Sequence, residues 1–442
     1  MDADQNAPRL SGVAVFFSVF LPFALGHYLS SLLRNVNAVL APQLVGALAL
    51  TPGQLGLLTS AFFFAFALVQ LPVGIALDRY GPRKVQLLLM TMAAGGAFLF
   101  ATGHSFAQLV VARAIIGCGL GGCFMSAVKA ISTWIAPKRL PSVQGYLIAV
   151  GGLGAASSTM PVRALLQYTD WRGLFMMLAC LTVFSGALIW LVTPKSRAAA
   201  GGNGAGQKPA TVRSVLDVYR APAFRTTISL VLIPHAVFFG IQGLWIGRWL
   251  SDVARFPDGA VAYLLYLGMA SVIFGAIAVG MITEWAGRRG IAAIDVAAVG
   301  VALFLLVQLA IVCNYRPSLQ TLSVLFTLVG TITGIEYAIV AQSLPRELTG
   351  RAATCLNLLI FVGAFLVQAG FGQIVELWQA DGAGHYPATA YRVAFGVLLA
   401  LQLPGLLRHC HRSFLVRRPV KCGIALLNEK EDYEIGSLRS PR

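Results

Sequence analysis

Charged residues are scarce in this chain of 442 residues, and this scarcity limits the class of protein. Asp, Glu, Lys and Arg make up only 11% of the residues and hydrophobic residues make up 57%, unlike a soluble globular protein. No Gly-x-x-x-x-Gly-Lys-Ser/Thr loop is present, which argues against ATP-driven chemistry, and the seven cysteines form no Cys-x-x-Cys pair. We expect no cleavable signal peptide, because the first residues are acidic and the first apolar run is too long. The composition indicates an integral membrane protein.

Long apolar runs are abundant, and each is about as long as a bilayer-spanning helix. They predict twelve spans, numbered 1 to 12 in chain order: residues 13–40, 54–77, 84–103, 107–134, 142–163, 172–193, 224–247, 259–283, 290–312, 318–343, 352–375 and 389–407. An even number of spans puts both termini on one side of the membrane.

The net charge of +16 is distributed unevenly between the loops. The loops on the side of the termini hold most of the basic residues, whereas those on the other side hold few. Because basic loops stay in the cytoplasm, we predict a multi-pass plasma-membrane protein, of the bacterial inner-membrane type, with both termini cytoplasmic. The charge therefore reports topology, and we expect no nucleic-acid partner.

Two loops between apolar runs share a pattern. The first is Gly74-Ile-Ala-Leu-Asp78-Arg79-Tyr-Gly81-Pro-Arg83-Lys84, and the second is Gly280-Met-Ile-Thr-Glu284-Trp-Ala-Gly287-Arg288-Arg289. We expect Gly74 to allow close helix approach and Gly81 to allow a tight turn. Two such motifs at equivalent places in the halves of the chain indicate a duplicated membrane bundle.

The first loop resembles the signature between helices 2 and 3 of the major facilitator superfamily of secondary transporters, although Pro82 here precedes the trailing basic residues. Arg113, followed by Gly117 and Gly119, resembles a second signature of that family. The resemblance covers about residues 10 to 407. It implies an all-α membrane fold of two pseudo-symmetric six-helix bundles, with helices 1, 4, 7 and 10 lining the transport path. Span 5 lacks the Gly-Pro pair that marks drug antiporters, which argues against drug efflux.

The resemblance also implies roles for the motif residues. Arg113 would serve packing and proton relay. Asp78 would contact basic residues and a helix N-terminus across the interface between the bundles. The gating residues would be Gly74, Asp78, Arg79, Gly81, Arg83, Gly280, Glu284 and Arg288.

The hydrophobic pattern breaks after residue 193. Residues 198–206 have the composition of a flexible linker and a basic segment follows them. We therefore predict a first bundle at 1–193, a cytoplasmic linker at 194–223, a second bundle at 224–407 and a disordered cytoplasmic tail at 408–442.

Ionisable residues inside the spans are costly to bury and mark functional sites. All of them lie on spans 1, 4, 7 and 10: His27, Arg34, Arg113, Lys129, His235 and Glu336. Helical spacing groups them with other polar or amphipathic residues into stripes: Ser30, Ser31 and Asn37 in span 1, Gln242, Trp245 and Trp249 in span 7, and Thr333 and Tyr337 in span 10. In span 11, Asn357 and Gln368 share nearly one face.

Arg34 resembles the first-helix arginine that binds the substrate's anionic group in organophosphate antiporters and organic-anion symporters. A guanidinium suits a carboxylate or phosphate. Span 7 lacks the second arginine of the antiporters, which disfavours a phosphate ester. The alternative is that Arg34 extends to the outer membrane interface.

Lys129 and Glu336 occupy nearly equivalent positions in the two halves. We predict that they face each other, with Lys129 as a second anion contact and Glu336 as the proton carrier; the alternative is a structural ion pair near the cytoplasmic mouth. His27 and His235 either take part in proton coupling or are hydrogen-bonded residues of the transport path. Gln242, Trp245, Tyr337 and Asn357 complete the predicted solute contacts.

These features predict a monomeric, proton-coupled transporter of a small organic solute, more specifically an anion, working by alternating access in the lipid bilayer without a cofactor or metal. Two alternatives remain: a proton-driven exporter of a hydrophobic or siderophore-like compound, and a transporter-like solute sensor. No His/Asp-rich or metal-spaced cluster favours an enzyme.

Overall fold

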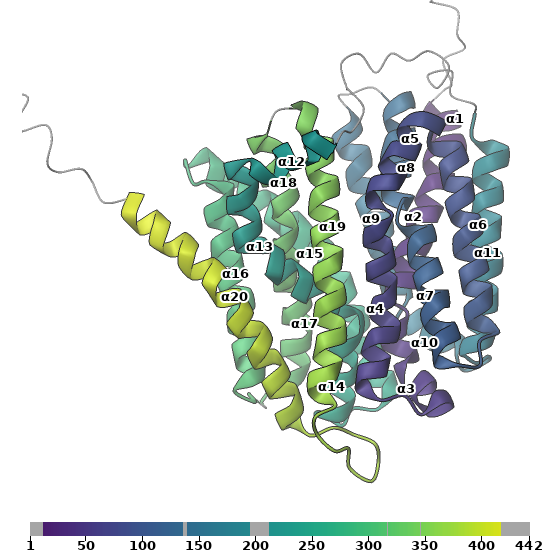
Figure 1. Ribbon diagram of the computed structural model, residues 1–442, viewed down its shortest axis with the longest axis vertical. Coiled ribbons are helices and arrows are strands. Elements are labelled where there is room, and N and C mark those ends of the chain that lie inside the picture. The colour runs from purple at the N-terminus through teal and green to yellow at the C-terminus, as the bar shows by residue number, and fades with distance from the viewer. Residues whose placement is uncertain (1–11, 136–138, 195–211, 316, 345, 417–442) are drawn as a thin grey trace, which may run out of the picture.

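The computed structural model describes residues 12–135, 139–194, 212–315, 317–344 and 346–416. All regular structure in these ranges is helical, which confirms the predicted all-α class. Most helices run along the vertical axis of Figure 1, and successive crossings alternate in direction. We call the end that carries residues 81, 194 and 212 the linker end, and the other the opposite end.

The first half of the chain forms one group of helices, which lies on the right in Figure 1. It consists of α1 (Gly12–Val15), the π-helical turn η1 (Phe16–Phe20), α2 (Leu21–Asn35), α3 (Asn37–Leu48), α4 (Pro52–Leu68), α5 (Gln70–Tyr80), α6 (Pro82–Ala101), α7 (Phe106–Leu120), α8 (Cys123–Trp134), α9 (Leu140–Ser157), α10 (Met160–Leu165) and α11 (Trp171–Val192).

The second half forms the other group. It consists of α12 (Val212–Arg220), α13 (Pro222–Gly240), the π-helical turn η4 (Ile241–Trp245), α14 (Ile246–Asp252), α15 (Asp258–Arg288), α16 (Ala293–Val312), α17 (Leu319–Gly330), the 3-10 turn η5 (Thr331–Ile335), α18 (Glu336–Ser343), α19 (Arg346–Val375) and α20 (Ala388–Val416).

Within the described ranges, ten helices or continuous runs of helices are long and apolar enough to cross a membrane, and the bent pair α4 and α5 makes an eleventh. The remaining predicted span corresponds to α9 followed by α10, which runs alongside the others. The helices therefore follow the twelve predicted runs.

Short polar segments fix where several spans begin at the opposite end. At the start of α4, the hydroxyl of Thr51 accepts a hydrogen bond from the Gln54 backbone amide, and the Gln54 side-chain oxygen accepts one from the Thr51 backbone amide. Ser105 and Gln108 form the same reciprocal cap at the start of α7. Such caps satisfy amide groups that the first helical turn leaves unpaired.

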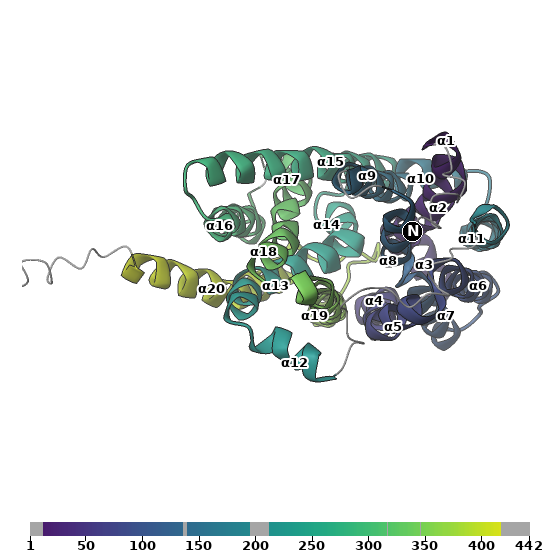
Figure 2. The ribbon, with the colours of Figure 1, turned by 90° about the horizontal axis from the view of Figure 1, so that it is seen from above.

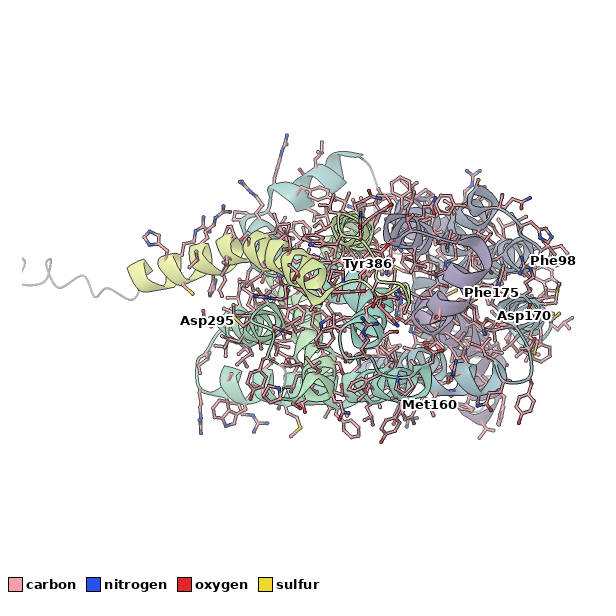
Figure 3. The ribbon with its side chains drawn as sticks, turned by 90° about the horizontal axis from the view of Figure 1, so that it is seen from below. Phe98, Met160, Asp170, Phe175, Asp295 and Tyr386 are labelled. Atoms are coloured by element: carbon pink, nitrogen blue, oxygen red, sulfur yellow. The ribbon has the colours of Figure 1, made fainter. Side chains whose placement is uncertain are left out.

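The outer faces of the bundle are apolar, as lipid contact requires. Leu88 and Phe274 are each 70% exposed, and Phe98, at the periphery in Figure 3, is 53% exposed. Exposed side chains of this size are unfavourable in water when they are numerous, whereas lipid tails solvate them. The surface thus agrees with a multi-pass membrane protein.

The two halves meet along two seams. In one, α4 packs against α19; in the other, α9 packs against α15, as Figure 2 shows from the linker end. Phe66 and Phe361 fill the first seam with their ring centroids 4.4 Å apart. The central site described below lies between α2 of the first half and α13, α18 and α19 of the second.

Two predicted boundary segments are helical where they are described. Residues 212–220 of the predicted linker form α12, which buries Val218 and lies beside the bundle in Figure 2. The predicted tail begins inside α20, which continues to Val416. Arg408 and Arg412 are exposed on this part of the helix, whereas His409 bonds Asp295. Residues 198–206 and 417–442 lie outside the described ranges.

Candidate functional site

Arg34 lies at the interface between the two halves and not at the outer membrane interface. It belongs to the last turn of α2, just before the break at Val36 that separates α2 from α3. Its guanidinium carbon lies 5.1 Å from the centroid of the Phe239 ring of α13, and its Nε is buried without a hydrogen-bond partner. An unpaired N–H of a buried guanidinium is unfavourable unless a ligand or water satisfies it.

His235 and Glu336 form a buried pair, and the Phe239 ring contacts both His235 and Arg34. His235 Nδ1 lies 2.5 Å from Glu336 Oε1, and the two side chains are 5% and 0% exposed. Glu336 begins α18 directly after the η5 turn, which brings it inside the second half. Its other carboxyl oxygen, Oε2, is buried without a partner. This oxygen can therefore take up a proton or accept a hydrogen bond from a further donor.

Tyr337 and Asn357 extend this group. The Tyr337 hydroxyl donates to the Asn357 side-chain oxygen, and the Tyr337 ring lies edge-on to the His235 ring with centroids 6.3 Å apart. We call the group formed by Arg34, His235, Phe239, Glu336, Tyr337 and Asn357 the central site. It combines one permanent cation, one carboxyl, one imidazole and neutral hydrogen-bonding groups, which is a set able to bind an organic anion and to hold a proton.

Phe239 was not among the residues predicted from the sequence, although the structure places it at the centre of this group. Its ring stacks on His235 with centroids 4.9 Å apart and planes 9° apart, and it packs against Phe361 at 5.4 Å. The available signal is its position one helical turn after His235. A phenylalanine in an apolar run otherwise carries no functional mark in a sequence.

His27 and Gln242 lie on the helices predicted to carry them. The His27 ring packs against Phe124 with centroids 5.2 Å apart and against Gly151 of α9, and its Nδ1 is buried without a partner. Gln242 accepts a hydrogen bond from Thr327 at 2.6 Å, while its side-chain nitrogen stays unpaired. Both side chains thus retain unused hydrogen-bonding capacity.

Trp245 is buried among helices instead of lining the central site. Its indole is 1% exposed, packs on Phe371, and donates from Nε1 to the Gln368 carbonyl at 2.9 Å. Gln368 Nε2 in turn donates to the Gly240 carbonyl, beside the π-helical turn η4. The second bond satisfies a carbonyl beside the π-helical turn. A π-helical turn changes the phase of a helix, so Trp245 does not lie on the face predicted from regular spacing.

Arg113 has packing partners from α2, α3 and α4. Its Nη1 donates to the Leu33 carbonyl at 3.0 Å, its guanidinium lies over the Phe62 ring, and the Asn37 amide oxygen, when turned toward it, accepts two further hydrogen bonds. These contacts stabilise the chain at the break between α2 and α3, which lies two residues after Arg34. Its predicted part in proton relay stays a prediction.

The predicted pairing of Lys129 with Glu336 is wrong. Lys129 forms an ion pair with Asp78 at the linker end, because it lies in the last half of α8 whereas Glu336 begins α18 deeper in the bundle. Asp78 was expected to contact the other half, yet its ion-pair partner Lys129 belongs to α8 of its own half. The matching sequence positions of Lys129 and Glu336 in the two halves placed them on equivalent helices, but not at the same depth in the bundle.

The other predicted gating residues differ in their surroundings. Gly81 has φ of +79°, which confirms the tight turn. A side chain at Gly74 would meet no atom within 4 Å, so the close helix approach predicted for Gly74 is wrong; the surroundings of Gly280 are equally open. In the second loop Gly290, and not Gly287, adopts positive φ.

The charged members of these loops make local contacts. Arg79 lies over Tyr80, Arg83 donates to the Trp190 carbonyl of α11 and lies over its ring, and Glu284 pairs with Arg288 one turn along α15.

Contacts at the opposite end join the halves. Arg163 of α10 pairs with Asp258 of α15 at 3.3 Å, and the Gly53 amide donates to Glu376 at 3.0 Å. Nearby, the guanidinium of Arg255 donates to Asp381 and lowers the pKa of that carboxyl to about 2.

A cavity of about 220 Å³ also lies at the opposite end. It includes Trp245, Arg248, Asp252 and Tyr386, the last of which is labelled near the centre in Figure 3. Among the described residues no group of three His, Cys, Asp or Glu side chains is placed to hold a metal ion.

The family model for the Major Facilitator Superfamily matches residues 23–368. The chain belongs to this family. The probable sulfoacetate transporter SauU of Cupriavidus necator is 31% identical over 157 residues, and the probable L-galactonate transporter of Escherichia coli is 30% identical over 197 residues. The alignments cover 35% and 44% of this chain, and only 36% and 42% of those two relatives.

The hexuronate transporter of Bacillus subtilis is 26% identical over 174 residues, which are 39% of this chain and 40% of that protein. The crystal structure of a bacterial homologue of the human lysosomal transporter Spinster, in an inward-facing and unoccupied conformation, matches 93% of this chain and 100% of its own with a TM-score of 0.71 at 16% identity. The fold is thus shared with solved transporters. Family and relatives are transporters and not enzymes.

Proposed function

We propose that this protein is a proton-coupled secondary transporter that carries a small organic anion through a membrane by alternating access. The observation that supports the proposal most is the central site, where the Arg34 guanidinium has an unpaired, buried N–H and where Phe239 contacts both Arg34 and the buried His235–Glu336 pair through His235. In this scheme Arg34 binds the anionic group of the solute, Tyr337 and Asn357 contact its polar body, and Glu336 carries the proton.

The names of the relatives support a carboxylate or sulfonate as the anionic group. Sulfoacetate, galactonate and hexuronates are all small polar anions, and they are the stated solutes of three relatives. One guanidinium with neutral neighbours fits such a group, whereas a phosphate ester would favour a second cation.

The distribution of contacts supports alternating access. Hydrogen bonds between the described parts of the two halves, from Arg163 to Asp258 and from Gly53 to Glu376, lie at the opposite end, and the Asp78–Lys129 pair at the linker end stays within one half. We infer a state closed at the opposite end. We place the linker end in the cytoplasm of a plasma membrane, with both termini on that side, and the working unit is a monomer.

The test is uptake into proteoliposomes that contain the purified protein. Sulfoacetate, L-galactonate and glucuronate are supplied separately, with and without an imposed pH gradient, and Arg34→Ala protein is the control. We expect at least one anion to accumulate above its equilibrium level only when the gradient is present and Arg34 is intact. Binding without any accumulation would instead identify a solute sensor.

A further inference from the structure

Phe239 contacts the cation of the central site and the imidazole that binds its carboxyl. The Arg34 guanidinium carbon lies 5.1 Å from its ring centroid, and the His235 ring stacks on it at 4.9 Å with the two planes 9° apart. His235 in turn holds Glu336 at 2.5 Å. The phenyl ring is therefore a direct neighbour of the cation and of the imidazole that binds the carboxyl.

Arg34 and Glu336 each have an atom without a partner, Nε and Oε2, and both atoms are buried. A buried guanidinium and a buried carboxylate normally pair through two hydrogen bonds, because each charge then compensates the opposite charge of its partner. Among the contacts of the described residues, none joins these two side chains. An aromatic face stabilises a guanidinium without using its N–H donors. Phe239 thus holds the cation in place while the donors stay available.

We propose that Phe239 is a positioning residue that keeps Arg34 apart from Glu336, so that the guanidinium remains available to a solute anion and the carboxyl remains available to a proton. This inference rests on the proposed function of the central site. Without the ring, Arg34 would pair with Glu336, and the solute would have to compete with an internal carboxylate.

The charged and titratable groups that contact the ring, or contact it through His235, come from three elements: Arg34 from α2, His235 from α13, and Glu336 and Tyr337 from α18, both of which contact His235. His27, two helical turns before Arg34 on α2, is a further titratable group near the cation. The Asn357 amide of α19 bonds Tyr337 and carries no charge. An internal Arg34–Glu336 pair would therefore be the main change in the electrostatics of the site when Phe239 is removed.

The test is a double-mutant cycle on purified protein, with L-galactonate, sulfoacetate and glucuronate as probes in isothermal titration calorimetry at about pH 6 and pH 8. We expect Phe239→Ala to weaken binding at least tenfold and to flatten its pH dependence. Adding Glu336→Gln should restore binding to within about threefold of Glu336→Gln alone, because the competing carboxylate is gone. Phe239→Tyr, which keeps the ring, should bind like the wild type.

Phe238→Ala is the matched control, because Phe238 is the neighbouring phenyl group on α13 and packs against Gly330. It should not show the rescue by Glu336→Gln. Simple addition of the Phe239→Ala and Glu336→Gln effects would overturn the proposal. If the wild type binds none of the probes, the proposed solute class fails. A structure of Phe239→Ala, or of Phe239→Leu if the first is unstable, then decides independently, because the proposal requires Arg34 and Glu336 to pair there.

Discussion

Arg34 is the residue on which the proposed recognition of an anion depends. We expect Arg34→Ala to abolish saturable binding and Arg34→Lys to restore it only weakly, because an ammonium group cannot form the two parallel hydrogen bonds of a guanidinium. A loss of tenfold corresponds to about 1.4 kcal/mol, which thermal-shift or calorimetric titration detects. Arg172→Ala is the control, since Arg172 bonds the Gly103 carbonyl at the opposite end. Unchanged binding in Arg34→Ala would remove this residue from the site.

Glu336 is the residue proposed to carry the proton. It is fully buried, and His235 is the partner of one of its two oxygens. Glu336→Gln imitates the protonated carboxyl, so we expect solute exchange down its own gradient to continue while accumulation driven by a pH gradient disappears. Uptake and counterflow in proteoliposomes measure the two separately. Vesicles of this variant that still concentrate solute would move the coupling site elsewhere, with His27 and His235 tested next.

At the scale of elements, the Asp78–Lys129 pair connects α5 to α8 at the linker end. Its side chains are 72% and 36% exposed, so the pair contributes at most about 1 kcal/mol to stability. We therefore expect Asp78→Asn to insert and melt almost normally but to transport more slowly, because α5 and α8 lose the ion pair that joins them at the linker end. Glu284→Gln is the comparison, since that carboxylate pairs within α15 and should affect transport less. A wild-type rate for inserted Asp78→Asn protein would contradict a gating role.

The loop between α19 and α20 carries a pH-dependent contact. Arg255 lowers the pKa of Asp381 to about 2, and the amides of Ala383 and His385 also donate to this carboxyl. A carboxyl with a lowered pKa contributes stability that is complete above its unfolded value of about 4 and is lost as the pH falls toward 2. Hydrogen exchange in residues 376–387 should therefore be constant from about pH 5 to 8, after correction for intrinsic rates. Asp381→Asn should raise it throughout, and a midpoint near neutrality would exclude this assignment.

At the scale of the whole molecule, Arg163 and Asp258 join the two halves at the opposite end. The side chains are 33% and 45% exposed, so the pair contributes less than about 1 kcal/mol, which changes a two-state population by less than about fivefold. We expect Arg163→Ala to raise the population that is open at the opposite end within that limit. Distances between spin labels on α10 and α15 measure it, and the reversed pair Arg163→Asp with Asp258→Arg should restore closure. No change in the distance distribution would show that the apolar seams alone keep this end closed.

The sequence by itself determined the fold class of this protein and the order of its membrane spans. Apolar runs of bilayer length predicted the spans, because a backbone in lipid must satisfy its own hydrogen bonds within a helix. The free energy needed to bury a charged group in a bilayer also marked Arg34, His235 and Glu336 as candidate functional residues, because such residues persist inside spans only when they have partners or ligands. The tight turn at Gly81 was predictable on steric grounds, because few other residues adopt positive φ without strain.

The tertiary structure alone decided which of these residues meet. Lys129 and Glu336 look equivalent in the sequence, yet depth within the bundle gives them Asp78 and His235 as partners. The η4 turn shifts the phase of span 7, so regular spacing could not predict where Trp245 points. Phe239 gained its contact with a cation only because the Arg34 side chain of α2 reaches α13 in the folded protein. A periodic pattern reports the face and order of residues along one helix, whereas partners depend on the depth, phase and contacts of several helices together.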